Sequence, residues 1–219
     1  MEQGTESVIT SVEQQKRNKR RYNIYVNESF AFSVHEDVLV KYRLFKGESI
    51  DNERLQEVIH AEERQEVYAH AIRYIGRSPR SVKEVRQKLK QKGYEQSLVD
   101  LTIERLKNEK YIDDGMFAMQ WTEHRIMYQS KGRNWVKQEL QQKGVASENI
   151  QEAIAALDEE TELAYACKLA AKKLPSLKGE PYERKRKLAA FLLRRGYTSS
   201  TVSQAVKEVT NESLEEWEM

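Results

Sequence analysis

One segment that occurs three times decides the fold: VRQKLKQKGYEQSLVDLTIERL at 85–106, VKQELQQKGVASENIQEAIAAL at 136–157 and LAAFLLRRGYTSSTVSQAVKEV at 188–209. The glycines at their centres, Gly93, Gly144 and Gly196, lie 51 and 52 residues apart. Apolar residues recur four and eight positions before each glycine and six, ten and thirteen positions after it. This spacing predicts a helix that ends at a left-handed glycine, followed by a second helix.

A longer helical pattern precedes each pair and completes a three-helix module of about 50 residues. We expect modules at 51–112, 113–157 and 158–210, with a solvated acidic tail at 211–219. Only nine glycines and three prolines are present, which favours helices over a β-sandwich. The predicted fold class is therefore mainly α, an elongated array of three tandem helix-turn-helix-like modules.

The first 50 residues follow a different pattern. Residues 22–26 and 30–34 alternate apolar and polar side chains around a short polar turn, which predicts a β-hairpin. Residues 8–12 can supply a third strand, joined to the hairpin by the basic turn at 16–21. A short helix at 38–46 follows, with Gly47 as its C′ residue.

Several helix starts can be predicted from capping residues. A long helix covers 51–76, and Ser81 with Glu84 has the spacing of a capping box. Asp113 and Asp114 can cap the next helix. Ser147 and Ser199 lie three residues after the repeat glycines, where an N-cap residue is expected, whereas the first copy has Gln96, a poor cap.

Composition excludes several classes of protein. No apolar run approaches the roughly 18 residues that a membrane span requires, and no signal-peptide pattern begins the chain. The single cysteine, Cys167, rules out an internal disulfide and fits a reducing compartment. We therefore expect a cytoplasmic protein that does not contact membranes.

Motifs of catalysis and metal binding are missing. The chain has no glycine-rich phosphate loop, no His-Glu-x-x-His and no Cys-x-x-Cys, and its four histidines do not cluster. Cys167 lies on an alanine-rich helix face, which predicts a buried, inert thiol. Asp113 and Asp114 fit a helix cap better than a metal site. We expect a protein that is not an enzyme and uses neither a cofactor nor a metal.

Two basic runs are the main functional signal. Residues 76–93 hold seven cations and one acid, and residues 168–195 hold ten cations and two acids. Such runs are either solvated helix faces or, when aligned on tandem modules, a stripe suited to a phosphate backbone or an acidic protein groove. The candidate binding residues are Arg77, Arg80, Lys83, Arg86, Lys90, Lys172, Lys173, Arg184, Lys185, Lys187, Arg194 and Arg195.

The aromatic residues Trp121, Tyr128 and Trp135 could stack on bases, but the spacing of Trp121 from Phe117 favours a core or inter-module contact. No side chain that would read base edges can be identified, so sequence-specific DNA recognition is not supported.

The motif series resembles the RecX family, bacterial regulators of the RecA recombinase. The first part of the match is Ser81-x-x-Glu84-Val85-Arg86-x-Lys88-Leu89, Lys92-Gly93-Tyr94 and Tyr111-Ile112-Asp113-Asp114-x-x-Phe117-Ala118-x-x-Trp121. The later modules add Lys131-Gly132, Glu139-Leu140, Lys143-Gly144-Val145 and Leu188-x-x-Phe191-Leu192-x-Arg194-Arg195-Gly196-Tyr197. The resemblance spans about residues 60–209. The N-terminal segment looks like the extension of Gram-positive members, some of which carry a further C-terminal module.

This resemblance implies a non-enzymatic modulator. Family members bind within the groove of the RecA–single-stranded-DNA filament, and they change RecA's ATPase, strand-exchange and coprotease activities in recombination and repair. By this analogy we expect a monomer whose partners are the RecA filament and, through the filament, single-stranded DNA, with at most weak direct DNA binding.

Two alternatives from other classes stay open. The helix-turn-helix-like pairs could form a direct DNA-binding module that acts without RecA, with tight and strongly salt-dependent binding to naked DNA. The modules could also be a structural scaffold for another protein, which would not depend on nucleic acid.

Overall fold

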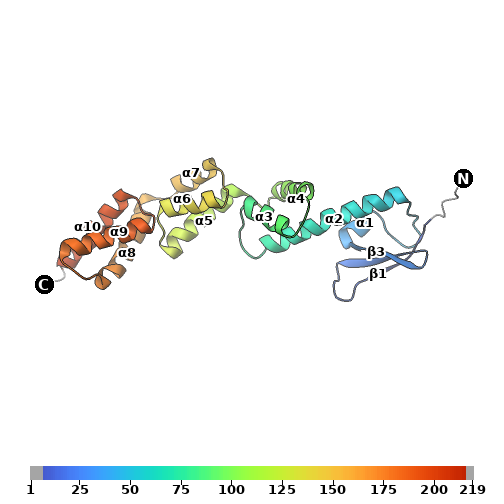
Figure 1. Cartoon of the computed structure of the whole chain (residues 1–219), viewed down its shortest axis with the longest axis horizontal. Helices are drawn as coiled ribbons and strands as arrows, with labels where there is room; N and C mark the ends of the chain where they lie inside the picture. Colours follow the sequence, from blue (N-terminus) through green and yellow to red (C-terminus); the bar gives the residue numbers. More distant parts are fainter. Residues whose placement is uncertain (1–6, 216–219) are drawn as a thin grey trace. The chain divides into compact units, whose positions relative to one another are not determined.

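The computed structural model describes residues 7–215, with side chains to residue 211. The chain forms two compact units. The first contains the residues up to Ser78 together with 85–109, and the second contains 79–84 together with the residues from Lys110 onward. Figure 1 shows the helices and strands of each unit, most of them labelled.

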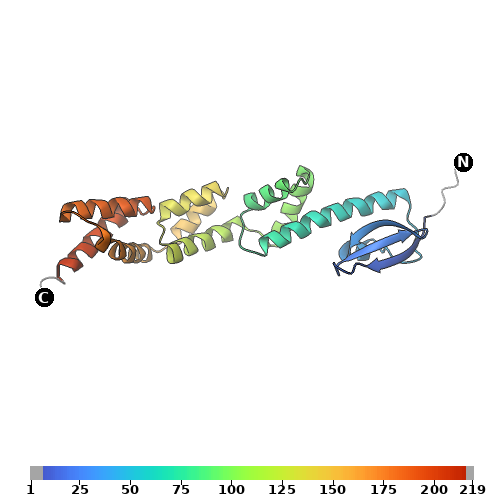
Figure 2. The ribbon, with the colours of Figure 1, turned by 60° about the horizontal axis from the view of Figure 1, so that its bottom comes forward.

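An antiparallel sheet in the order β1-β2-β3 begins the first unit. Its strands are β1 (Ile9–Gln14), β2 (Arg21–Val26) and β3 (Ser29–His35), seen side by side in Figure 2. Ile9, Ile24 and Val34 are almost completely buried, in one apolar cluster with residues of the helices that follow. The predicted hairpin and its third strand are therefore confirmed.

The first helix differs from the prediction. The helix α1 covers Glu36–Lys41 rather than 38–46, and the residue that turns the chain out of it is Arg43, with φ +49°. The Leu44 N–H donates to the Leu39 carbonyl at 3.0 Å, which closes a Schellman-type turn. Leu44 is fully buried, so the chain must turn back early to place it in the core. Gly47 does adopt a positive φ, +92°, but in a later turn.

Three long helices each precede a helix pair. They are α2 (Asn52–Ile75), α5 (Asp114–Gln129) and α8 (Glu159–Lys173). Asp51 caps α2 by accepting the Arg54 N–H at 2.7 Å, and Asp113 caps α5 by accepting two N–H groups, from Gly115 and Met116. Both predicted helix starts are confirmed, but Asp114 is the first residue of α5 rather than a cap of it, and its Oδ1 accepts the Val82 N–H at 2.9 Å.

The helix pairs follow the predicted pattern. They are α3 (Val82–Gln91) with α4 (Gln96–Asn108), α6 (Arg133–Gln142) with α7 (Ser147–Ala155), and α9 (Pro181–Arg194) with α10 (Ser199–Glu215). The short 3₁₀ helix Leu174–Ser176 lies between α8 and α9. Gly93, Gly144 and Gly196 have φ angles of +88°, +75° and +89°. All three repeat glycines therefore end a helix in the left-handed region, which side chains with a Cβ disfavour.

The start of each second helix lies one residue earlier than predicted. The N-cap of α7 is Ala146, and that of α4 is Glu95; neither accepts a capping hydrogen bond through its side chain. Thr198 takes this role before α10, where its Oγ1 accepts the Thr201 N–H at 3.2 Å. Ser147 and Ser199 are instead the first helical residues, because the turn after each glycine uses two residues rather than three.

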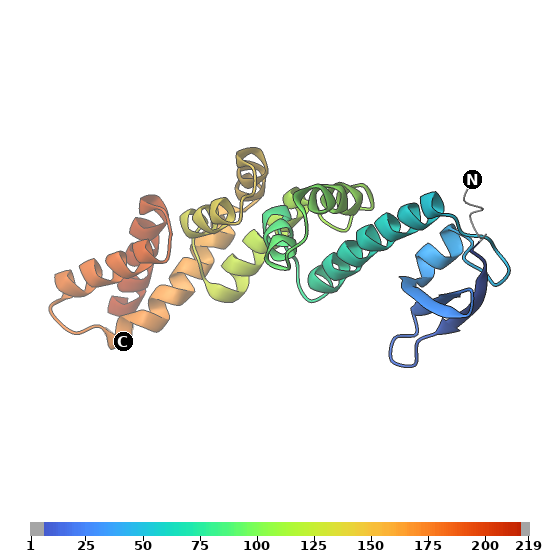
Figure 3. The ribbon, with the colours of Figure 1, turned by 45° about the vertical axis from the view of Figure 1, so that its right-hand side comes forward.

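The mainly helical fold with three three-helix modules is thus confirmed, and Figure 3 shows the three helices of the third module, α8 to α10. The helix α10 continues to Glu215, five residues beyond the module end expected at 210. The rest of the expected acidic tail, and the side chains of its glutamates, lie outside the described residues.

Within the second unit, the start of α6 is hydrogen-bonded to the end of α9. The Gly132 N–H donates to the Arg195 carbonyl and the Asn134 N–H to the Gly196 carbonyl, both at 2.9 Å. These bonds satisfy donors at the start of α6 and acceptors at the end of α9, which a helix cannot satisfy by itself. We call this contact the α6–α9 joint. A Cβ on Gly132 would lie 2.3 Å from the Tyr197 nitrogen, so only glycine permits the approach.

A similar contact forms where the segment 79–84 meets the end of α6. The Ser81 hydroxyl donates to the Lys143 carbonyl at 2.7 Å, and the Lys83 ammonium donates to the Gln142 carbonyl at 2.9 Å. The predicted capping box forms as well, since Ser81 N–H donates to Glu84 at 3.0 Å and Glu84 N–H to Ser81 Oγ at 3.2 Å. Glu84 also pairs with the Lys143 ammonium at 2.6 Å.

The α6–α9 joint predicts different costs for two glycine replacements. Gly132→Ala should destabilise the protein by about 3 kcal/mol, because its Cβ would overlap backbone atoms. Gly93→Ala should cost only about 1–2 kcal/mol, the strain of the left-handed conformation, because no atom lies within 4 Å of its Cβ. Thermal unfolding followed by circular dichroism checks both values. Equal losses of stability in the two variants would contradict the close backbone approach at the α6–α9 joint.

A buried carboxylate beside this joint gives a second prediction. Glu162 is fully buried and accepts the Arg133 backbone N–H at 2.8 Å and its Nε at 2.5 Å. Glu162→Ala should cost about 3 kcal/mol, because it leaves the Arg133 guanidinium, 20% exposed, without its main partner. Glu159→Ala is the matched control: Glu159 contacts the same arginine at 3.3 Å but is 86% exposed, so its removal should cost under about 0.5 kcal/mol.

The carboxylate of Glu84 should make stability depend on pH. Burial by itself raises the pKa of Glu84, but hydrogen bonds from Lys143 and from the Ser81 N–H outweigh burial, and the pKa lies below its ordinary value of 4.5. A lowered pKa stabilises the folded state above pH 4.5, and the contribution is lost as the pH falls through the folded-state pKa. Glu84→Gln should therefore lower the melting temperature at about pH 7 and have little effect at about pH 3. An equal effect at both pH values would show that the charge of Glu84 contributes nothing.

Candidate interaction surface

Structural contacts use several cations of the first basic run. Arg80 lies 3.9 Å from Glu84, Lys83 binds the end of α6, and Arg86 pairs with Asp100. These side chains hold helix starts and helix packing in place. Arg77, just after α2, and Lys90, on α3, are exposed. Lys83 is exposed as well, but its ammonium already donates to the Gln142 carbonyl.

The second basic run lies on α8 and α9. Lys172, Lys185 and Arg194 are exposed. Lys187 is held by Glu183 at 3.5 Å and donates to the Lys178 carbonyl at 2.8 Å. Arg184 is half-buried. Lys172, Lys185 and Arg194 therefore come from two of the three helices of the third module, α8 and α9.

The remaining candidates, Lys173 and Arg195, meet at one aromatic ring. The Lys173 ammonium lies 5.6 Å from the centroid of the Phe191 ring, and the Arg195 guanidinium lies 5.4 Å from the same centroid. Both distances fit cation–π attraction. The structure therefore brings together the last residue of α8 and the residue that follows α9, which are 22 positions apart in the sequence.

A second cation–aromatic pair lies beside the first. The Lys131 ammonium lies 3.4 Å from the centroid of the Trp135 ring. The backbone of Trp135 approaches Gly196 so closely that a Cβ there would lie 2.4 Å from the Trp135 nitrogen. The α6–α9 joint thus places the Lys131–Trp135 pair next to the Phe191 ring and its two cations. We call this set the junction cluster; it consists of Lys131, Trp135, Lys173, Phe191 and Arg195.

Positive charge accumulates at the junction cluster. The pKa of Lys131 is lowered first by partial burial and second by the nearby charge of Arg195; Arg125 lowers it further, and only Glu139 opposes the shift. A lysine whose pKa is lowered by neighbouring cations gains from an anion placed beside it. The cluster thus combines surplus positive charge with aromatic side chains, the composition that suits a phosphate backbone with stacked bases.

Lys131 belongs to neither basic run, and the sequence pointed to it only as part of the Lys131-Gly132 motif, not as a binding residue. Its signal is weak: one lysine before a glycine, outside any periodic pattern. Trp135 was considered as a stacking residue, and it lies at the surface with about a third of its area exposed. Trp121, in contrast, is enclosed. Phe117 stacks on it at 5.4 Å, Arg125 and Lys143 lie over its ring, and its Nε1 donates to Glu139 at 2.9 Å.

The thiol of Cys167 differs from the predicted buried, inert group. Cys167 is half-buried, and its thiol donates to Glu208 on α10 at 3.2 Å. This contact arises because α8 and α10 pack together, and α10 carries its polar side chains at the edge of that interface.

Among the side chains of residues 7–211, no three His, Cys, Asp or Glu groups gather in a way that could hold a metal ion. The helices of this part of the chain are all too short or too polar to cross a membrane.

Four family models match successive parts of the chain. They are described as the regulatory protein RecX N-terminal domain (residues 7–51) and the first, second and third three-helix domains of RecX (68–106, 113–154 and 160–206). Each of the three-helix models falls on one of the modules described above.

Individual proteins give the same result. The regulatory protein RecX of Halalkalibacterium halodurans is 36% identical over 220 residues, which cover 97% of this chain and 82% of the relative. RecX of Clostridium botulinum is 34% identical over 209 residues, covering 94% and 98%. A crystal structure of a regulatory protein RecX, 29% identical, matches 92% of this chain and 99% of its own with a TM-score of 0.76. RecX from Lactobacillus salivarius, 20% identical with a TM-score of 0.64 over 68% of this chain, shares the fold. This chain therefore belongs to the RecX family of regulatory proteins.

Proposed function

We propose that this protein binds the RecA–single-stranded-DNA filament and regulates RecA in recombination and DNA repair. It acts in the cytoplasm, without catalysis, and changes the ATPase, strand-exchange and coprotease activities of RecA. The junction cluster is the observation that carries this proposal, because it offers an anionic polymer a concentrated positive site. Membership of the RecX family supports RecA as the protein partner.

The filament suits a chain of repeated modules. Its DNA carries a regular series of phosphates, and each cation that replaces a counterion contributes a salt-dependent part of the binding free energy. Modules tied together in one chain bind with high effective concentration once the first is engaged. Modest contacts from Arg77 and Lys90, from the junction cluster, and from the exposed cations of α8 and α9 can therefore add up to stable binding.

The proposal predicts an effect on RecA ATPase. Substoichiometric amounts of the full chain should lower the rate of ATP hydrolysis by RecA of the same organism on single-stranded DNA. Binding measured to RecA alone, to DNA alone and to the assembled filament, across a salt series, separates the alternatives. Preference for the filament supports the proposal. Equal binding to naked DNA favours a direct DNA-binding module, and binding that ignores nucleic acid favours a scaffold.

The exposed cations of the third module should matter for this binding. The triple variant Lys172→Glu, Lys185→Glu and Arg194→Glu should weaken filament binding about tenfold or more at low salt, since three attractive charges become repulsive. These side chains are exposed, so helical circular dichroism should not change. The matched control, Lys172→Arg, Lys185→Arg and Arg194→Lys, keeps the charges and should bind like wild type. If the glutamate variant also binds like wild type, these residues do not face the filament.

A further inference from the structure

We propose that the loop between β1 and β2, together with Arg73 on α2, binds the phosphate backbone of single-stranded DNA. The loop contains residues 15–20 and projects from one end of the sheet (Figure 3). We call it the basic loop. This inference assigns a second anion-binding surface, in the first unit and outside the junction cluster, to a segment that the family resemblance explains only as an extension.

Hydrogen bonds fix the backbone of the basic loop. The Gln15 N–H donates to the Arg21 carbonyl at 2.9 Å, and the Arg21 N–H donates to the Asn18 carbonyl at 3.0 Å. The Gln14 side chain donates to the Lys19 carbonyl at 2.7 Å. The loop thus presents its side chains from a defined backbone, which lowers the entropy cost of binding.

The charges at the tip of the loop are available. Lys16, Arg17 and Lys19 are exposed, and none of them forms an ion pair with the described side chains, residues 7–211. The neighbouring arginines differ. Arg20 pairs with Glu36 at 3.3 Å while staying 74% exposed, and Arg21 is held inside by Glu62 at 2.9 Å. The tip therefore concentrates three uncompensated cations on four consecutive residues.

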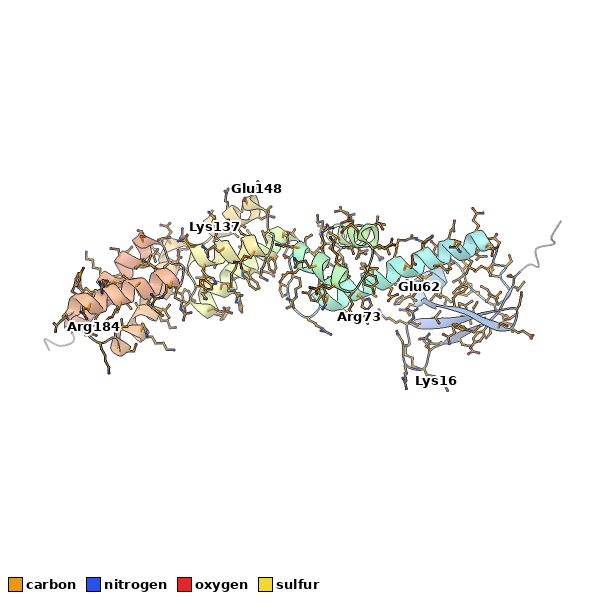
Figure 4. The ribbon with its side chains drawn as sticks, viewed as in Figure 1. Lys16, Glu62, Arg73, Lys137, Glu148 and Arg184 are labelled. Carbon is orange, nitrogen blue, oxygen red and sulfur yellow. The ribbon has the colours of Figure 1, made fainter. Side chains whose placement is uncertain are left out.

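Arg73 extends this charge onto α2. A cavity of about 290 Å³ is lined on one side by Asn18 and Arg20 of the loop and on the other by Ala69 and Arg73 of α2. Figure 4 shows Lys16 and Arg73 on the same side of the first unit. Burial lowers the pKa of His70, the charge of Arg73 lowers it further and the charge of Glu66 opposes the shift, so Arg73 lies near both His70 and Glu66.

Carboxylates near the cavity are occupied by other groups. Glu62 binds Arg21 and accepts the His35 N–H at 2.7 Å. Asp37 accepts the Gln65 amide at 2.7 Å, and Glu66 accepts the Tyr94 hydroxyl at 3.2 Å. Of these acids only Glu62 is neutralised by a cation, whereas Asp37 and Glu66 accept from neutral groups and keep their negative charge at the cavity. The three cations at the tip of the loop, in contrast, face solvent without an acidic partner among the described side chains. The local charge balance at the loop is therefore positive.

The composition of the loop favours a phosphate backbone over an acidic protein. Residues 14–21 read QQKRNKRR and contain no apolar side chain. Protein interfaces need apolar or aromatic anchors at their centre. Lysine, arginine, asparagine and glutamine are instead the side chains that contact phosphate oxygens.

Salt dependence tests the proposal with the full chain and a fluorescent oligo-dT. Each phosphate contact on a single strand contributes about 0.7 to the slope of log K against log salt concentration. Arg17→Gln with Lys19→Gln should therefore reduce the slope by about 1.4. The matched control is Lys41→Gln with Lys46→Gln, which removes the same charge. The N–H of Gly47, the residue after Lys46, donates to the carbonyl of Ile9, which lies at the end of β1 away from the loop. The control should therefore leave the slope nearly unchanged.

Each outcome decides the question. A slope that is lower for the loop variant but unchanged for the control supports the proposal, whereas equal slopes for the two variants overturn it. If the loop variant loses binding to poly-glutamate but keeps the slope on oligo-dT, the loop serves an acidic protein and the proposal is wrong. This inference rests on the proposed function in one respect only, that the RecA filament supplies the single-stranded DNA. ATPase assays of the wild-type chain with RecA can fail while the oligo-dT result stands, so the two failures are distinguishable.

Discussion

The backbone at the ends of the repeated helices is the constraint on which the rest of the structure depends. A helix leaves carbonyls unsatisfied at one end and N–H groups at the other. Here a left-handed glycine stops each helix, and at Gly196 the exposed carbonyls accept N–H groups from the start of α6. One geometry thus ends a helix and attaches the next module. The absence of a side chain at Gly132 and Gly196 permits the close approach.

The same joint determines where charge accumulates. It brings Lys131 and Trp135 from the second module next to Phe191 and Arg195 from the third. Three cations of the first basic run, in contrast, make contacts within the protein: Arg80, Lys83 and Arg86 stabilise helix starts and helix packing. The number of lysines and arginines in a run therefore does not tell which of them the packing leaves available to an anionic partner. In the availability of its cations the basic loop of the sheet resembles the junction cluster, although the two do not share a sequence pattern.

Periodicity predicted most of the fold because each module is locally encoded. Apolar spacing, left-handed glycines and capping side chains act within a few residues, so the helices, the capping box at Ser81 and the hairpin could all be predicted. The errors have local causes as well. Helix α1 ends early because the buried Leu44 must reach the core, and the N-caps after the glycines fall one residue sooner because the turn is shorter.

The sequence by itself determined the class of fold, the threefold repeat, the family and the two basic runs. Only the tertiary structure decided which cations act together. Lys173 and Arg195 meet at Phe191, Lys131 joins them through the α6–α9 joint, and Arg73 lies across a cavity from the basic loop. The physical reason is that backbone preferences extend over one or two turns of chain. Electrostatic interactions, in contrast, depend on distances in space, which packing between modules sets.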